Sequence, residues 1–143
     1  RLRRQREITM SMFSIFSVSG SAISAQSQRL NVVASNLANV DAVAGPDGQA
    51  YKARQVVFQT SPMCSDSSAG VRVSAINENN TPGRRIHDPG HPSADAEGYV
   101  THSNVNAVDE MVNMISASRS YQNNVEVMNT AKTLLLKTLQ MGQ

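Results

Sequence analysis

The 143 residues suit one domain, and 40% of them are apolar, which would normally support one compact core. Large side chains are few, with three Tyr, three Phe and no Trp, so a thick core or a base-stacking surface lacks its usual anchors. The net charge is +2, but residues 1–9 alone hold four Arg against one Glu, which leaves −1 for the rest. This near-neutral body argues against a nucleic-acid-binding protein, which clusters Lys and Arg on one face.

The basic segment 1–9 is predicted to be a disordered extension, and its arginines would also suit contact with anionic lipid. From Ile8 to Val18, serines and a threonine interrupt the apolar residues, and no apolar run approaches the ~20 residues of a membrane-spanning helix. A secretory signal, with its continuous apolar region and cleavage site, is not evident. If the protein leaves the cytoplasm, we expect another export route.

A long amphipathic helix is predicted at the amino-terminal end, in a helical segment 10–41. Residues 13–41 contain no Pro and a single Gly. Apolar residues recur there every seven positions with others between them, at Phe16, Ile23, Leu30, Val33, Leu37 and Val40. This spacing places them on one face of a helix and predicts interhelical packing.

The middle segment, 42–103, has a different composition and is predicted to form turns and short strands. Most of the turn signals of the chain fall near or inside it, among them GPDG at 45–48, TPG at 81–83 and DPG at 88–90. Residues 51–58 and 71–76 are predicted strands. The Ser-rich stretch 60–70 between them, which carries the single Cys64, is predicted to be a loop.

A second long helix is predicted in the carboxy-terminal segment 104–143, again without Pro in its interior. Asn106 suits its first turn as a capping residue, and Asp109 and Glu110 would lie favourably at its positive end. The predicted stripe consists of Val108, Met111, Val112, Ile115, Ser118, Gln122, Val125 and Met128, followed by leucines at 134–136 and 139.

These elements predict a mainly α protein with a small β element. The two terminal helices would pair as an antiparallel, coiled-coil-like domain, with a turn-rich β-hairpin and loop insertion between them. One pair leaves much of each apolar stripe uncovered, and long helices gain most of their stability by packing that face. The missing contacts are therefore expected from other subunits.

Polar residues lie in or beside both stripes, including Gln26, Asn31, Asn36 and Asn39 on the first helix. They fit solvated helix-surface amides. They also fit hydrogen bonds between packed helices of neighbouring subunits, where an unpaired buried amide would reject a wrong register. Arg119 has the same two interpretations, a solvated charge or an interface group that meets a carboxylate or carbonyl of an adjacent subunit.

Two segments carry a resemblance to a known family. QRLNVVASNLANVD at 28–41 resembles the amino-terminal signature of the flagellar axial proteins, which are the rod, hook and hook-associated subunits. ASRSYQNNVEVMNT at 117–130 resembles their carboxy-terminal signature, and GPDGQAY at 45–51 and DPGHPSADAEGYV at 88–100 are similar to a short rod member. The resemblance covers roughly residues 13–143; the Arg-rich start has no counterpart.

The resemblance implies a structural subunit of the basal-body (proximal) rod, not an enzyme, without cofactor or small-molecule substrate. It implies a periplasmic location, and export by the flagellar type III apparatus without a cleavable signal peptide. The implied partners are copies of the chain, the rod proteins FlgB, FlgF and FlgG, and the rod adaptor FliE. We expect the assembly interface to include Leu30, Asn31, Asn36, Leu37, Asn39, Val108, Ile115, Arg119, Tyr121, Val125, Met128 and Leu135.

Two other function classes remain as alternatives. His87, Asp88, His91, Asp95 and nearby His102 could in principle form a metal site of a small hydrolase, although the Pro and Gly among them are equally explained as turn chemistry. A soluble helical adaptor or secretion chaperone is the other alternative, and it would form a stable small oligomer in isolation.

Overall fold

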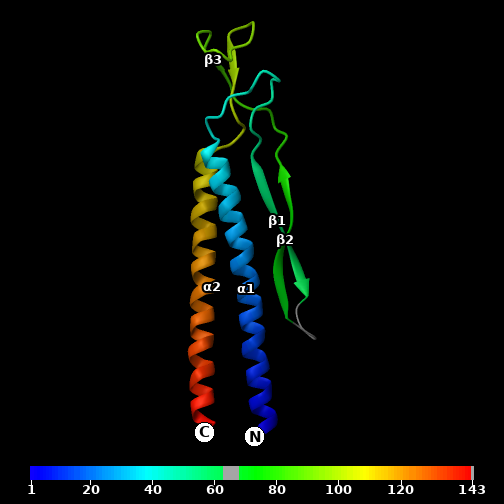
Figure 1. Ribbon diagram of the computed structural model, residues 1–143, viewed down its shortest axis with the longest axis vertical. Coiled ribbons are helices and arrows are strands. Elements are labelled where there is room, and N and C mark those ends of the chain that lie inside the picture. Colours follow the sequence, from blue (N-terminus) through cyan, green and yellow to red (C-terminus); the bar gives the residue numbers. More distant parts are fainter. Residues whose placement is uncertain (63–67, 143) are drawn as a thin grey trace. The chain divides into compact units, whose positions relative to one another are not determined.

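A computed structural model describes residues 1–62 and 68–142 of the chain. Two long helices lie at the ends of the sequence, α1 at Leu2–Ala38 and α2 at Ala107–Met141. Four strands lie between them: β1 at Arg54–Pro62, β2 at Ala69–Glu78, β3 at Arg85–His87 and β4 at Tyr99–Thr101 (Figure 1). The predicted fold class, terminal helices with a small β insertion, is confirmed.

The chain divides into two compact units, and each is assembled from distant parts of the sequence. Unit 1 comprises Arg1–Gln28, Phe58–Ser74 and Ala117–Gln143, and unit 2 comprises Arg29–Val57 and Ala75–Ser116. In unit 2, Arg29 and Asn36 of α1 contact Asn113 and Glu110 of α2, respectively. From the first of these contacts to the second, the residue number rises in α1 and falls in α2, so the two helices are antiparallel there.

The first helix is longer than its sequence stripe. It continues back to Leu2, through the basic segment 1–9, and ends at Ala38, where the amide of Asn39 bonds to the carbonyls of Ser35 and Asn36. Every residue of the predicted stripe between Phe16 and Val40 is buried or half-buried, with Val33 only 4% exposed. The seven-residue spacing therefore identified the covered face of this helix.

The apolar character of α1 exceeds the sequence-based expectation. One 18-residue window of the helix has a hydropathy of 1.4, which by length and composition is enough to cross a membrane. The expectation that no stretch approaches a span is therefore wrong by this measure. Only 12% of that window is buried. Such a helix is weak evidence for a membrane, because helices that pack against protein and signal sequences have the same composition.

The second helix starts where its capping residue predicts. Asn106 Oδ1 accepts hydrogen bonds from the amides of Val108 and Asp109, at 3.1 and 3.3 Å, which satisfies two donors that a helix leaves unpaired. The buried face of α2 in unit 1 carries small residues, Ala117 at 0% and Ala131 at 4% exposure. Three large residues of the predicted stripe in this unit, Val125, Met128 and Leu135, are half-buried. Those in unit 2, Val108, Met111, Val112 and Ile115, are exposed. The stripe therefore marks a partly covered face of α2 in unit 1 and an exposed face in unit 2.

The strands form two separate two-stranded sheets, β1 with β2 and β3 with β4. Strand β1 begins at Arg54, three residues later than predicted, and extends to Pro62, and β2 already begins at Ala69. Both ends of the predicted loop 60–70 therefore belong to strands. Cys64 lies outside the described residues. In unit 1 the amide of Val71 donates to Ser21 Oγ at 3.1 Å, which joins β2 to α1. The short antiparallel pair of β3 and β4 is not predicted from the sequence.

Candidate assembly surface

In unit 2, Asn36 connects α1 to both β1 and α2. Its Nδ2 donates to the carbonyl of Arg54 at 2.8 Å and to Glu110 Oε2 at 3.1 Å. Its Oδ1 accepts from the amide of Arg54 at 3.0 Å and from the Tyr51 hydroxyl at 2.9 Å. The side chain is fully buried, and each of its polar atoms makes two hydrogen bonds. Asn36 is thus an internal connector of this unit.

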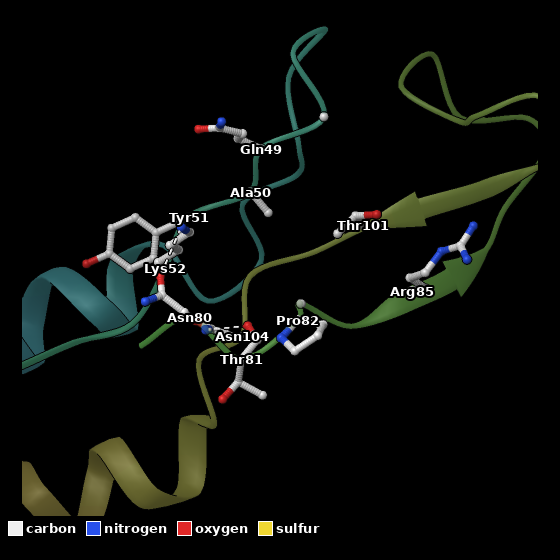
Figure 2. Close-up of a pocket in the computed structure, with 12 residues that line it drawn as sticks. Gln49, Ala50, Tyr51, Lys52, Asn80, Thr81, Pro82, Arg85, Thr101 and Asn104 are labelled. Carbon is white, nitrogen blue, oxygen red and sulfur yellow. Dashed lines mark hydrogen bonds between the residues drawn. The ribbon is translucent and has the colours of Figure 1, made fainter. Parts of the chain in front are cut away.

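A second amide holds the segment that leads into β1 against the segment that follows β2. Asn104 Oδ1 accepts from the amide of Ala53 at 2.6 Å, and its Nδ2 donates to the carbonyls of Asn79 and Thr81 at 2.7 and 2.9 Å. Figure 2 shows Asn104 beside Thr81 at one side of a pocket of about 320 Å³. Lys52, on the same pocket, donates to Asn80 at 3.1 Å. The side chains of Asn104 and Lys52 therefore form hydrogen bonds within the protein.

One carboxylate organises the loop between β3 and β4. Asp95 Oδ1 accepts from the amides of Tyr99 and Glu97, both at 2.9 Å, and Oδ2 accepts from Arg85 at 2.9 Å. These hydrogen bonds, above all that of Tyr99, lower the pKa of Asp95 below its ordinary value of 3.8. The Arg85 guanidinium also lies 4.8 Å from the centre of the Tyr99 ring. The loop is therefore held by several contacts.

Two of the residues considered as metal ligands, His87 and His91, make other contacts. His87 packs edge-on against Tyr99 with ring centroids 5.0 Å apart, and His91 Nδ1 accepts a backbone amide two residues on. In the part of the chain that the structure describes, no three His, Cys, Asp or Glu residues are grouped in a way that could hold a metal ion. Turn chemistry accounts for this segment.

The outward face of α2 in unit 2 is apolar and uncovered. Four residues there, spaced as i, i+3, i+4 and i+7, are 55–68% exposed: Val108, Met111, Val112 and Ile115. We call them the ridge. None of the four is charged, and their spacing puts them on one side of the helix. Contiguous exposed apolar residues of this kind mark interaction sites on soluble proteins.

In unit 1, α1 and α2 together form a shallow apolar groove of about 440 Å³. Ile15 of α1 and Val127 and Leu134 of α2 supply its large side chains, and they are 40%, 46% and 49% exposed. Ala131 lies between them and is buried, and Asn123, Glu126 and Thr130 of α2 complete the lining. Each unit therefore presents an apolar surface that the chain itself does not cover.

Comparisons with known proteins agree with this picture. The model of the family described as flagella basal body rod protein matches residues 16–46, and the model of the flagellar basal body rod FlgEFG protein carboxy-terminal region matches residues 96–141. Proteins named flagellar basal-body rod protein FlgC are 59% identical in Yersinia enterocolitica, 56% in Escherichia coli O157:H7 and 54% in Salmonella typhimurium. Each alignment covers 94% of this chain and 100% of the relative.

The chain belongs to the FlgC family of flagellar basal-body rod proteins. It is therefore a structural subunit of the rod, and its place is the flagellar basal body. The two family models match segments that include most of α1 and all of α2 together with β4.

The predicted interface residues of this rod protein fall into three classes of exposure. Asn36 is buried, as described above. Six are half-buried: Leu30, Leu37, Asn39, Val125, Met128 and Leu135. Five are exposed: Asn31, Val108, Ile115, Arg119 and Tyr121. The exposed residues remain available to a neighbouring subunit, whereas Asn36 has its hydrogen bonds inside the monomer. Asn36 therefore hydrogen-bonds within this unit, and its place in the assembly interface stays a prediction.

Sequence reasoning missed the groups that support Asn36. Glu110 was considered only for the helix dipole, although it is 8% exposed and bonded to Asn36. A usable signal was present, because Glu110, Ala117 and Ala131 are spaced by seven and fourteen residues along one face of α2. Tyr51 and Asn104 carry no comparable pattern. Their roles depend on contacts with residues far away in the sequence.

Proposed function

We propose that the two terminal helices of this rod subunit are its assembly surface, and that it polymerises by helix packing into the torque-transmitting shaft. The amount of exposed surface supports the proposal. The chain exposes 9981 Å². A compact monomer of 15.4 kDa is expected to expose about 7,200 Å², so roughly 2,800 Å² is in excess. Obligate interfaces bury on the order of 2,000–5,000 Å² counted over both partners, so the excess on one subunit is more than its share of one such interface.

The character of the exposed surface supports the same function. Most of the large apolar side chains with high exposure lie on the helices, and on α2 they include the ridge as well as Leu136 and Leu139 at 50% and 58%. Helices of this length gain their stability mainly from packing an apolar face. Burial against other subunits would supply that packing and would make a stiff tube of interlocked helices.

The partners proposed for this surface are copies of the chain, the rod proteins FlgB, FlgF and FlgG, and the adaptor FliE. We further propose a periplasmic position, reached through the flagellar type III export apparatus without a cleaved signal peptide. Membership of the rod family supports these assignments. A non-catalytic role is proposed on the same ground, since the relatives carry the names of structural rod proteins.

Complementation of a strain that lacks its own rod gene of this family tests the proposal. Wild-type protein should restore motility and complete basal bodies in electron cryotomograms. A variant with Leu136→Asp and Leu139→Asp should be expressed and exported but should leave the rod incomplete. Complete rods built from that variant would contradict the role of the helices. Failure of the wild-type protein to enter the rod would contradict the function itself.

A further inference from the structure

The formal charge of the protein is divided unevenly between its two units. Unit 1 contains eight Arg and Lys against three Asp and Glu, which gives +5, whereas unit 2 contains five against eight, which gives −3. Half of the cations of unit 1 lie at the start of the chain, at positions 1, 3, 4 and 6, with Glu7 beside them. A negatively charged partner is therefore attracted to unit 1, above all to this end of α1, and is repelled by unit 2.

The arginines at the start of α1 are exposed, and they oppose the dipole of their own helix. No acidic residue lies in the first turn of α1, whose positive end favours anions and disfavours cations. Within residues 1–62 and 68–142 the ion pairs all belong to unit 2, so none neutralises Arg3, Arg4 or Arg6. Arg3 and Arg6 also repel each other at a spacing of three residues. The chain itself does not compensate this positive charge, and an external anionic partner would.

Exposed apolar side chains beside the arginines distinguish between anionic partners. Leu2 is 79% and Phe13 is 56% exposed. Leu2 lies four residues before Arg6 and Phe13 seven after it, which puts all three on one side of α1. A nucleic acid would pair with the guanidinium groups but would leave the apolar side chains in water. The interface of a lipid bilayer accepts both, since headgroup phosphates accept hydrogen bonds and the acyl boundary accepts apolar groups.

We propose that the amino-terminal end of α1 binds the surface of an anionic lipid bilayer. The binding surface, which we call the basic end, consists of Arg1, Leu2, Arg3, Arg4, Arg6 and Phe13. The guanidinium groups donate hydrogen bonds to lipid phosphate oxygens, and the two apolar side chains enter the boundary between headgroups and acyl chains. Charge and apolar burial act together, because either alone gives weak attachment. This binding is a second property of the subunit, separate from helix packing between subunits.

Co-sedimentation of the purified full chain with lipid vesicles tests the proposal. The probes are vesicles of phosphatidylcholine alone and vesicles that also contain the anionic lipid phosphatidylglycerol. Wild-type protein should bind the anionic vesicles, bind the neutral ones much more weakly, and lose affinity as salt is raised, because salt screens exposed charges. Equal affinity for the two kinds of vesicle, or no binding to the anionic ones, would overturn the proposal.

Charge-matched variants show whether the basic end makes the contact. Arg3→Gln combined with Arg6→Gln should weaken binding to the anionic vesicles about 30-fold, since each basic side chain near such a surface contributes about a factor of five. Lys52→Gln combined with Arg84→Gln removes the same charge from exposed positions of unit 2 and should leave the affinity unchanged. Equal losses from the two pairs would assign the binding to net charge alone and would refute the role of the basic end.

The apolar contribution separates a bilayer from other polyanions. Phe13→Ser should weaken vesicle binding about 10-fold, because the ring loses its burial among the lipids. Ile76→Ser, at an exposed position of β2 in unit 2, should not change it. A duplex oligonucleotide is the other probe. If vesicle binding is insensitive to Phe13→Ser, or the oligonucleotide binds as tightly as the anionic vesicles, the site is a general polyanion site and the proposal is wrong.

Hydrogen exchange on the wild-type chain keeps the proposal testable if a variant folds poorly. Amide hydrogens of residues 2–13 should gain protection when anionic vesicles are added and should not with neutral ones. Unchanged exchange in this segment would overturn the proposal. Incorporation into rods is scored separately, so a wild-type chain that builds rods but binds no anionic vesicles removes this inference and leaves the assembly function in place.

Discussion

Asn36 on α1 donates a hydrogen bond to the buried carboxylate of Glu110 on α2, with 3.1 Å between Nδ2 and Oε2. The same amide binds both backbone polar groups of Arg54. One side chain therefore ties two helices and a strand together within unit 2. Removing a buried polar side chain of this kind lowers the stability of the protein, because its partners are left without hydrogen bonds.

Asn36→Ala should destabilise the protein by about 2–3 kcal/mol, since Glu110 and the backbone of Arg54 would lose buried partners. Urea or thermal unfolding measures this change. Asn31→Ala is the matched control, because Asn31 is an exposed amide on the same helix, and it should stay within about 0.5 kcal/mol of wild type. Equal effects of the two substitutions would refute the role of Asn36.

Gly83→Ala should destabilise the protein by about 2 kcal/mol or more, because the added Cβ would overlap the backbone carbonyl oxygen of His102. The neighbouring backbone cannot give way as a flexible side chain would. Gly20→Ala provides the contrast. Nothing lies within 4 Å of that added Cβ, and Ala favours the helix over Gly by about 0.5–1 kcal/mol. Melting temperatures should therefore shift in opposite directions.

Arg119→Ala should weaken rod assembly while leaving the level of the monomer unchanged. Arg119 is exposed on α2, and its guanidinium can hold a carboxylate or carbonyl of a neighbouring subunit in a fixed geometry. Swimming in soft agar and counts of complete basal bodies measure the effect. Lys132→Ala, another exposed cation of α2, should behave like wild type. Normal motility and intact rods with Arg119→Ala would exclude the role.

Acidification should loosen the loop between β3 and β4 through Asp95. Its pKa is lower in the folded than in the unfolded chain, mainly because the amide of Tyr99 bonds to the carboxylate. The stabilising effect is fully present above the unfolded pKa and is lost as pH falls through the folded value. NMR titration of the Tyr99 and Glu97 amides should give a midpoint below 3.8. Asp95→Asn should abolish that transition.

The first half of α1 should exchange its amide hydrogens fast in the dilute monomer. Residues 2–8 and several positions up to Ser17 are exposed, whereas Ser19, Ala25 and Val33 are buried further along the helix. Local stability follows burial, so protection should rise from the amino terminus towards Val33. Incorporation into the rod should then protect the whole helix. Uniform protection along α1 in the monomer would contradict the view that the first half of this helix is stabilised only by contacts with other subunits.

The amino-acid sequence by itself determined the class of fold, the covered face of α1 and the start of α2. Local physics explains this: apolar residues seven apart define a helix face, and Asn106 offers its side chain to the free amides that follow it. The family signatures, which occupy both helices, were also readable without any structure.

Only the tertiary structure decided which face of α2 is buried and what the asparagines do. Two seven-residue patterns run along α2, one through Val108 and Ile115 and one through Glu110, Ala117 and Ala131. The structure shows that the second is buried and the first is exposed. Which side of a helix is covered depends on what packs against it, and spacing along one helix does not contain that information. Asn36 was likewise ambiguous until Glu110 and Arg54 lay beside it, because hydrogen bonds between residues distant in sequence exist only after the chain has folded.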